Sequence, residues 1–392
     1  MKKDVPPPGK PMMSAQYFLH FAVMGILLPY FNLYCYHLGF SGFQIGLLSS
    51  IKSTAMVLFP LLWGGLADRF QMRRALYIGC NFLSAGIWIF FIFTTDFRAM
   101  LLITIFHAVF YSPIIAFLEA FTMDLLKKEK NSYGSIRAWG SISFILAVSL
   151  TGKFIDMRTI EIIVMLTFFG SFSAALVSTQ IPRVVLVSPK MDFSSNARQI
   201  LKKRTLVFLT SGFLMLVSHG TYYGFYSIHL EKLGFPSSFI GLTWAMASTA
   251  EIFVMLRSKS ILKTFSIEKI LFFSFLTAVF RWMILFWAQS GVIILISQIT
   301  HAATYGTFHI AGIIFMDSQV PEGAKTLGQA VNNAVTYGFG LTVGLLLNGY
   351  FFEILGASGM FLISAGFALA GTITWIIFQM MGKSGILADH PT

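Results

Sequence analysis

The sequence contains very few charged residues. Only 11% of its 392 residues are Asp, Glu, Lys or Arg, whereas a soluble globular protein carries about 25%. Hydrophobic residues make up 56% of the chain, and the mean hydropathy is +0.74. A chain with so little charge cannot cover a water-facing surface. The composition therefore excludes an ordinary soluble domain and indicates an integral membrane protein.

Cysteine is also scarce, and familiar enzyme motifs are missing. Cys35 and Cys80, the two cysteines, both fall in apolar runs, so no disulfide framework is indicated. The sequence has no HExxH, no GxSxG and no Walker loop, which argues against an enzyme and against ATP as the energy source. No residues have the spacing of a zinc site. We expect no metal and no cofactor.

Long apolar runs occupy most of the chain. A membrane-spanning helix needs about 20 apolar residues, and the sequence divides into about twelve such runs. We therefore predict an all-α integral membrane fold. The predicted spans are residues 14–37, 43–67, 75–94, 99–126, 134–155, 159–181, 205–229, 237–262, 267–288, 290–318, 325–352 and 356–381. The polar, proline-rich first ten residues lack the apolar core of a signal peptide, so the first run is expected to remain as a helix.

The net charge of +12 is concentrated in alternate loops. One set of loops holds most of the basic residues, with clusters at Arg69–Arg74 and Lys127–Lys130 and in the segment 183–204. The other set has only Arg98, Lys153, Arg158 and Lys232. The positive-inside rule then places both termini in the cytoplasm. Solvated loop charge accounts for the basic balance, so we expect no nucleic-acid partner.

Two similar segments divide the chain into halves. LGFSGFQIGL begins at Leu38 and LGFPSSFIGL begins at Leu233, and each precedes a long apolar run. An offset near half the chain length predicts two similar six-helix bundles, residues 1–181 and 205–392. The polar segment 182–204 is then the cytoplasmic linker. Repeats of this kind are a known plan of secondary transporters, which bind their substrates near the middle of the membrane.

The loop after the second run reads GGLADRFQMRR, from Gly64 to Arg74. It resembles the loop signature of the major facilitator superfamily. Gln71 stands where that family usually has glycine. The resemblance implies the twelve-helix major facilitator fold, with Asp68, Arg69 and Arg73 as gating residues on the cytoplasmic side. A solvated loop acid is the alternative for Asp68.

Five further segments narrow the resemblance. They are YGSIRAWGSISF from Tyr133, TYYGF from Thr221, WAMASTAEI from Trp244, FRWMI from Phe280 and THAATYGTFHIA from Thr300. Together they look like the phenylpropionate permease branch of the superfamily, and the lactose permease and nucleoside–proton symporters are similar more distantly. The spacings of Glu119 to Arg137 and of Arg281 to His301 resemble those of the functional charges of lactose permease. Thr304, however, stands where that permease has a carboxylate.

Ionisable residues inside the apolar runs are the main functional candidates, because a bilayer makes such charges costly. They are Lys52, Glu119, Asp124, Arg137, Glu251, Arg257, Arg281, Asp317, His107, His219, His301 and His309. Asp124, Arg257 and Asp317 lie near predicted helix ends, where capping or snorkelling is sufficient explanation.

Two arginines and three proton acceptors are the most specific of these candidates. Arg137 and Arg281, one in each half, could flank an anionic substrate because a guanidinium matches a carboxylate. Glu251, Glu119 and His301 are the candidates for proton coupling, since buried acids and imidazoles can gain and lose a proton during a cycle. The alternative is charge balance alone, with Arg137 paired to Glu119 and Arg281 paired to Glu251.

Aromatic and amide side chains beside these motifs could contact the substrate. An aromatic ring can stack on an aromatic cargo, and an amide can hydrogen-bond it or lock helices together. Packing is the alternative for each. The candidates are Trp139, Tyr222, Tyr223, Trp244, Tyr305 and Asn332.

The leading hypothesis is a monomeric, proton-coupled symporter of a small aromatic acid in the bacterial cytoplasmic membrane. Its expected partners are the small-molecule substrate, the proton and the lipid bilayer. A sugar or nucleoside symporter is the alternative within transport. A transport-inactive membrane sensor or scaffold is the alternative from another class.

Overall fold

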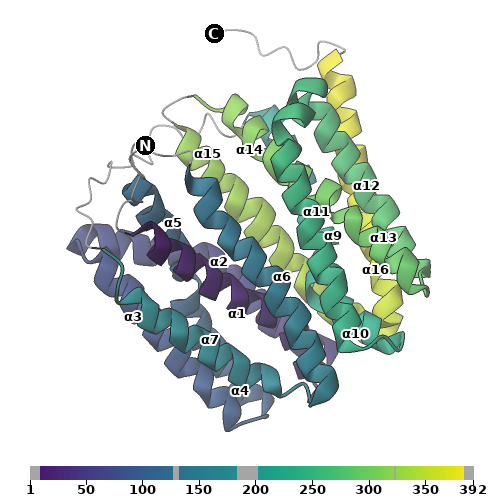
Figure 1. The fold of residues 1–392 in the computed structure, drawn as a ribbon. Helices are drawn as coiled ribbons and strands as arrows, with labels where there is room; N and C mark the ends of the chain where they lie inside the picture. The colour runs from purple at the N-terminus through teal and green to yellow at the C-terminus, as the bar shows by residue number, and fades with distance from the viewer. Residues whose placement is uncertain (1–8, 127–131, 183–201, 322–323, 384–392) are drawn as a thin grey trace, which may run out of the picture. The chain divides into compact units, whose positions relative to one another are not determined.

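The computed structural model describes residues 9–126, 132–182, 202–321 and 324–383, and within these ranges every regular element is a helix (Figure 1). The described chain forms two compact units. The first contains the chain up to Pro189 together with Gly234–Ala245, and the second contains Lys190–Leu233 and the chain from Met246. The loop 127–130 and most of the predicted linker, 182–204, lie outside the described residues.

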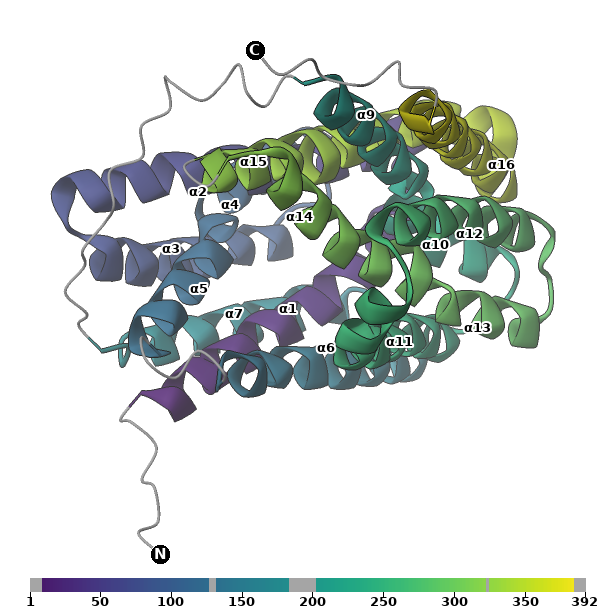
Figure 2. The same cartoon turned by 90° about the horizontal axis from the view of Figure 1, so that it is seen from above.

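The first unit is built from eight helical segments in the described chain, and α1 packs along both α6 and α7 (Figures 1 and 2). On its other side α7 packs against α3, which also contacts α4. The segments are α1 (Lys10–His37), α2 (Gly42–Phe70), α3 (Arg73–Trp88), η1 (Ile89–Ile92), α4 (Phe97–Tyr111), α5 (Pro113–Leu126), α6 (Tyr133–Met157) and α7 (Ile162–Ser178).

The predicted span 99–126 is interrupted between α4 and α5. Pro113 has no backbone N–H, so it cannot donate to the carbonyl of Val109 four residues earlier. The indole Nε1 of Trp63 donates to that carbonyl instead, at 2.9 Å. The break is therefore satisfied by a side chain from α2, as expected for a helix interrupted inside an apolar bundle.

The start of α11 (Ser237–Thr264) belongs to the first unit, although the prediction placed it in the second bundle. The carboxylate of Asp156 accepts hydrogen bonds from the backbone N–H groups of Ser237 and Ser238, at 2.7 and 2.9 Å. The hydroxyl of Tyr30 lies 2.9 Å from the carbonyl of Val148 and 3.2 Å from that of Ser237. An acid from α6 thus caps the N-terminus of α11, where negative charge is favourable.

The second unit is a bundle whose helices are interrupted by wider turns. Residues 302–307 and 333–340 each form a π-helix, a feature found mostly at functional sites. Gly356 has φ 67° and divides α16 into two helical parts. The segments are α9 (Lys203–Ser218), α10 (Gly220–Lys232), the rest of α11, α12 (Ile267–Trp287), α13 (Gly291–Ile299), η3 (Ala302–Thr307), α14 (Phe308–Gln319), α15 (Lys325–Asn332), η5 (Asn333–Gly340) and α16 (Leu341–Lys383).

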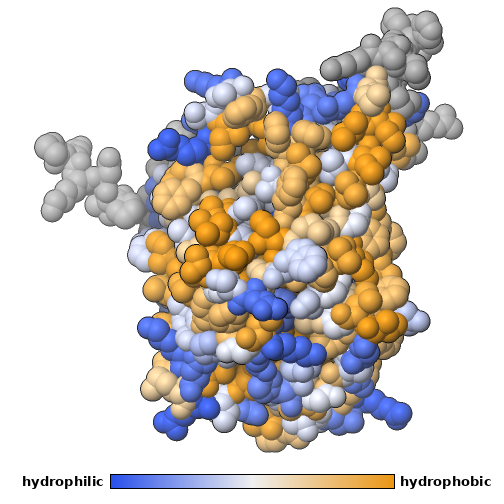
Figure 3. Space-filling view, turned by 90° about the vertical axis from the view of Figure 1, so that its right-hand side faces the viewer, coloured by the Kyte–Doolittle hydropathy of each residue, from blue (hydrophilic) through white to orange (hydrophobic). Residues whose placement is uncertain are grey.

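The outer surface is apolar enough to face lipid. Within the described residues, 9 helices have the length and hydropathy to cross a membrane, and one of these, Lys325–Met380, has 56 residues and contains the interruption at Gly356. Large hydrophobic side chains such as Phe280, Trp287 and Val292 are exposed. Figure 3 shows hydrophobic side chains gathered into a broad band on one face, with hydrophilic residues toward both ends.

Candidate functional site

A carboxylate, an imidazole and a guanidinium form a hydrogen-bonded chain inside the second unit. The Oε1 atom of Glu251 lies 2.8 Å from Nε2 of His301. On the other side of the ring, Nδ1 of His301 lies 2.6 Å from NH1 of Arg281. Three elements supply these residues: α11 carries Glu251, α12 carries Arg281, and His301 immediately precedes the π-helical turn η3. The structure thus brings together three residues that the sequence singled out.

The direction of the hydrogen bonds follows from the arginine. A guanidinium only donates, so Nδ1 of His301 must accept from Arg281. The ring proton of the neutral imidazole is then on Nε2, which donates to Glu251. A second proton on the imidazole would place an N–H against the guanidinium. The geometry therefore favours the carboxyl of Glu251 as the group that receives an added proton.

Arg281 itself is wholly enclosed. Its side chain is 0% exposed, NH1 also donates to Thr304 Oγ1 at 3.2 Å, and NH2 donates to Gln298 Oε1 at 3.1 Å. Its guanidinium carbon lies 4.4 Å from the ring centroid of Tyr222. Thr304, which replaces the carboxylate of lactose permease, therefore acts here as a neutral acceptor for Arg281. The predicted pairing of Arg281 with Glu251 takes place through His301.

Aromatic rings line this chain. Tyr222 and Tyr305 both lie close to His301, with ring centroids at 5.0 and 5.4 Å from that of the imidazole. Tyr223 is half-buried, and its ring centroid lies 6.1 Å from that of Tyr305. The side chain of Glu251 is 21% exposed, whereas that of His301 is 6% exposed. Glu251 is therefore the member of the chain that solvent or a cargo reaches most easily.

Further histidine and neutral polar side chains lie at or near this cluster. His219 is fully buried, with its ring centroid 6.2 Å from that of His301, and its Nε2 atom has no hydrogen-bond partner in the described part of the chain. Tyr337 binds Nδ1 of His309 at 2.8 Å. His219 and His309 were visible as histidines inside apolar runs, but Gln298 and Tyr337 carry no such signal because neutral polar residues are common in membrane helices.

Glu119 and Arg137, the possible pair of the first unit, do not approach to ion-pair distance in the described chain. Glu119 and Arg137 interact electrostatically, but they are not among the ion pairs within 4.0 Å in the described part of the chain. Arg137 instead lies over the ring of Phe21, 4.0 Å from its centroid. Trp139 is 48% exposed and packs against Phe18 at 6.4 Å. Glu119 is also exposed, so this pair is accessible in a way that Arg281 is not.

Two other residues that were predicted to contact the substrate are buried. Trp244 is 4% exposed and belongs to the part of α11 that packs with the first unit. Asn332 is 2% exposed, and its Oδ1 accepts a hydrogen bond from Thr336 at 3.1 Å. Asn332 therefore already has a partner at the junction of α15 and the π-helix η5.

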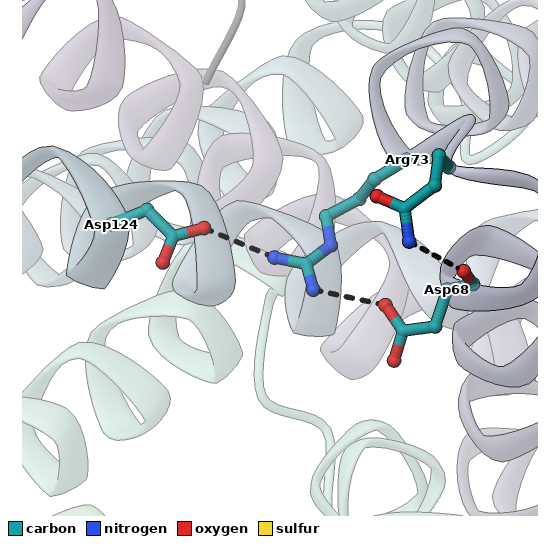
Figure 4. A network of polar contacts seen from close by, with 4 residues as sticks. Asp68, Arg73 and Asp124 are labelled. Carbon is teal, nitrogen blue, oxygen red and sulfur yellow. Dashed lines mark hydrogen bonds and ion pairs between the residues drawn. The ribbon is translucent and has the colours of Figure 1, made fainter. Parts of the chain in front are cut away.

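The loop between α2 and α3 forms the ionic network in Figure 4. Arg73 lies between two acids, with NH2 3.2 Å from Asp68 Oδ1 and NH1 3.1 Å from Asp124 Oδ2. Arg69 is exposed and lies over the ring of Phe70. Arg74 donates to the carbonyls of Thr179 and Ile181 at the end of α7. Asp68 and Arg73 thus connect α2, α3 and α5, and the gating role of Asp68, Arg69 and Arg73 stays a prediction.

The conformation of Gln71 explains the usual glycine of this loop signature. Gln71 has φ 52° and ψ 37°, the left-handed conformation, and it ends α2. Non-glycine residues adopt this conformation at a cost. The amide of Gln71 donates to the carbonyl of Asp68 at 2.7 Å, which offsets part of that cost.

Comparison with known proteins identifies the family. A model described as MFS_1 like family matches residues 11–363. The chain belongs to this family. Members of the major facilitator superfamily are transporters rather than enzymes, and this chain is accordingly a multi-pass membrane protein of the transporter class.

Individual relatives span nearly the whole chain. The "Probable 3-phenylpropionic acid transporter" of Escherichia coli (strain K12) is 26% identical over 374 residues, covering 91% of this chain and 94% of that protein. The maltose permease of Geobacillus stearothermophilus is 22% identical and covers 86% of each chain. The crystal structure of nucleoside transporter NupG superposes with a TM-score of 0.85 at 20% identity, covering 94% of this chain and 98% of that one. The last likeness concerns the fold alone.

Proposed function

We propose that the protein is a proton-coupled symporter of a small aromatic organic acid. It would work by alternating access, as a monomer in the bacterial cytoplasmic membrane with both termini in the cytoplasm. We further propose that its helices form twelve spans in two six-helix bundles. The observation that carries the proposal is the chain from Glu251 through His301 to Arg281.

Proton coupling is supported by the arrangement of that chain. The buried cation of Arg281 fixes the imidazole as a donor toward Glu251, and Glu251 is the partly exposed end. Protonation of Glu251 removes the negative charge that balances Arg281 through His301. Because an uncompensated buried charge is costly, the protonated state leaves the protein with an additional net positive charge, which favours binding of an anion. Binding of the proton and binding of an anionic cargo would then assist one another.

The substrate class is supported by the rings and by one relative. Tyr222, Tyr223 and Tyr305 surround the ionic chain, and a relative over nearly the whole length is named for 3-phenylpropionic acid. A sugar or nucleoside symporter is the second candidate, and the maltose permease relative favours the sugar.

The deciding experiment is uptake by reconstituted vesicles under an imposed pH gradient, with 3-phenylpropionate, a nucleoside and maltose as substrates. We expect the gradient to drive accumulation of the acid. Glu251→Gln should abolish this accumulation while leaving exchange of labelled for unlabelled acid across the membrane. Glu268→Gln, which removes an exposed acid in the first turn of α12, is the matched control.

Each of the other outcomes would refute a specific part of the proposal. Accumulation of maltose or the nucleoside alone would refute the aromatic acid and favour the second candidate. Gradient-driven accumulation that persists in Glu251→Gln would refute the role of Glu251. A protein that moves none of the three in either assay would fit a transport-inactive sensor or scaffold.

A further inference from the structure

Lys52 places a positive charge on a half-buried side chain, far from both ends of α2. It lies about 15 Å along α2 from the first residue of that helix, farther than its own side chain can reach back. It shares a helix face with the buried residues Ile45, Leu48 and Ser49, so it points away from the lipid-facing side of α2. Its ammonium lies 3.7 Å from the ring centroid of Phe31.

No carboxylate accompanies this ammonium. The ion pairs in the described part of the chain do not include Lys52, and its recorded contact is the ring of Phe31. A cation–π contact offsets only part of the cost of a charge held inside an apolar bundle. Charged residues in such positions are commonly paired or used, so Lys52 calls for an anion that the described chain does not supply.

Four buried polar atoms on α4 and its C-cap also have no hydrogen-bond partner among the described residues. The atoms are Thr104 Oγ1, His107 Nε2, Tyr111 Oη and Ser112 Oγ. Their spacing places them along one face of the helix. Thr104, His107 and Ser112 are only 2–3% exposed. Buried polar groups in proteins nearly always have partners, so this row indicates bound water or a polar ligand.

A series of aromatic contacts, through Phe31 and Trp88, connects the lysine with the polar row. Phe31, which carries Lys52 on its face, packs against Trp88 with ring centroids at 5.7 Å, and Trp88 lies 5.0 Å from His107. His107 in turn stacks on Tyr111 at 5.0 Å. An electrostatic interaction connects Lys52 directly with His107. One cation and several neutral donors therefore lie together in a single unit.

This site is separate from the Glu119–Arg137 pair. Arg137 lies over Phe21 of α1, and Lys52 lies over Phe31 of the same helix. Ten residues of helix separate the two rings by about 15 Å. Arg137 and Lys52 therefore lie at different depths.

We propose that Lys52 and the polar row on α4 bind the carboxylate of the cargo. A carboxylate supplies the missing negative charge, and its oxygens accept from an ammonium, from hydroxyls and from an imidazole N–H. A cation would be repelled by Lys52, and a neutral sugar would leave the ammonium without a counter-charge. The inference rests on the proposed function, because it concerns an anionic cargo.

The test compares an acid with its uncharged analogue. Binding of 3-phenylpropionate and of 3-phenylpropanol is measured on the purified full-length protein, for the wild type and Lys52→Met, which removes the charge and keeps an unbranched apolar stem. We expect the affinity for the acid to fall about 10- to 100-fold, the range for loss of a hydrogen bond to a charged group, and the affinity for the alcohol to change less than about twofold. Lys153→Met, an exposed lysine of α6, should change neither.

A chemical rescue separates charge from folding. Lys52→Cys is made in a chain whose two native cysteines, Cys35 and Cys80, are replaced by alanine. Reaction with 2-aminoethyl methanethiosulfonate restores an ammonium near its original position, whereas the methyl reagent adds no charge. We expect only the first reagent to restore acid binding.

The outcomes distinguish the two proposals. A wild type that binds no aromatic acid refutes the proposed function and this inference with it. A wild type that binds the acid, with Lys52→Met binding it equally well, overturns the inference alone. Equal rescue by the two reagents would also overturn it, because the charge would then be irrelevant.

Discussion

A methyl group added at Gly152 should weaken the packing of the start of α11 against α6. An ideal Cβ at Gly152 would lie 2.3 Å from the carbonyl oxygen of Ser237 and 2.6 Å from the hydroxyl of Tyr30. Ordinary contacts of a Cβ begin at 3.4 Å, so the backbone at Ser237 would have to move by about 1 Å. Overpacking of this kind costs about 1–3 kcal/mol, which shifts the ratio of detached to docked molecules by about 5- to 150-fold.

The assay measures how often the contact opens. Ser237 is 8% exposed, so a cysteine placed there is shielded while α11 is docked. In a chain with the two native cysteines replaced by alanine, Ser237→Cys is labelled with a maleimide, and Gly152→Ala should raise the labelling rate by about the factor given above. The control is Gly86→Ala, where no atom lies within 4 Å of the added Cβ.

Gly241→Ala provides an independent check. Its added Cβ would lie 2.5 Å from the carbonyl oxygen of Val148 and 2.6 Å from the same Tyr30 hydroxyl, so it should act in the same direction. Labelling rates of both variants within about twofold of the Gly86→Ala control would refute the idea that close backbone contact holds α11 in place.

Three further changes test local features of the first unit. Gln71→Gly should relieve the left-handed backbone, where a side chain costs about 1–2 kcal/mol, and raise the thermal unfolding midpoint of the purified protein; an unchanged or lower midpoint would mean that its hydrogen bond dominates. Arg73→Ala removes the shared partner of two acids and should lower that midpoint, whereas Arg69→Ala, at an exposed position, should not. Trp63→Phe leaves the carbonyl of Val109 without its donor and should cost about 1–3 kcal/mol, measured by denaturant unfolding; no measurable loss would show that water replaces the indole.

The two repeated segments share a local backbone conformation. Gly39 and Gly234, matched in the repeat, have φ 80° and 85°, and each precedes a long helix. The repeat also suggested that α11 belongs wholly to the second half. That interpretation could not include Asp156 or Tyr30, because a repeat compares equivalent residues and gives no information about contacts between residues that are not equivalent.

The charged residues of the site were predictable because the membrane makes them conspicuous. Glu251, Arg281 and His301 stood out by charge, and the structure joins them in one chain. The position of a residue along a helix, however, does not say in which direction around the helix axis its side chain points. The spacing of Glu119 and Arg137 along the chain therefore did not determine whether they form an ion pair.

The cations at the candidate sites of the two units have different partners, and this difference indicates different roles for the two units. In the second unit, NH1 and NH2 of Arg281 are hydrogen-bonded, and its charge is linked through His301 to Glu251. In the first unit, Arg137 and Lys52 lie on aromatic rings with no carboxylate within ion-pair distance in the described chain. A cation that is already neutralised gains little from a cargo carboxylate, whereas one without a carboxylate at ion-pair distance gains more. On this reasoning the second unit binds the proton and the first unit binds the anion. Neutralising Lys52 should then weaken acid binding without abolishing its pH dependence. Neutralising Glu251 should abolish the pH dependence without weakening acid binding.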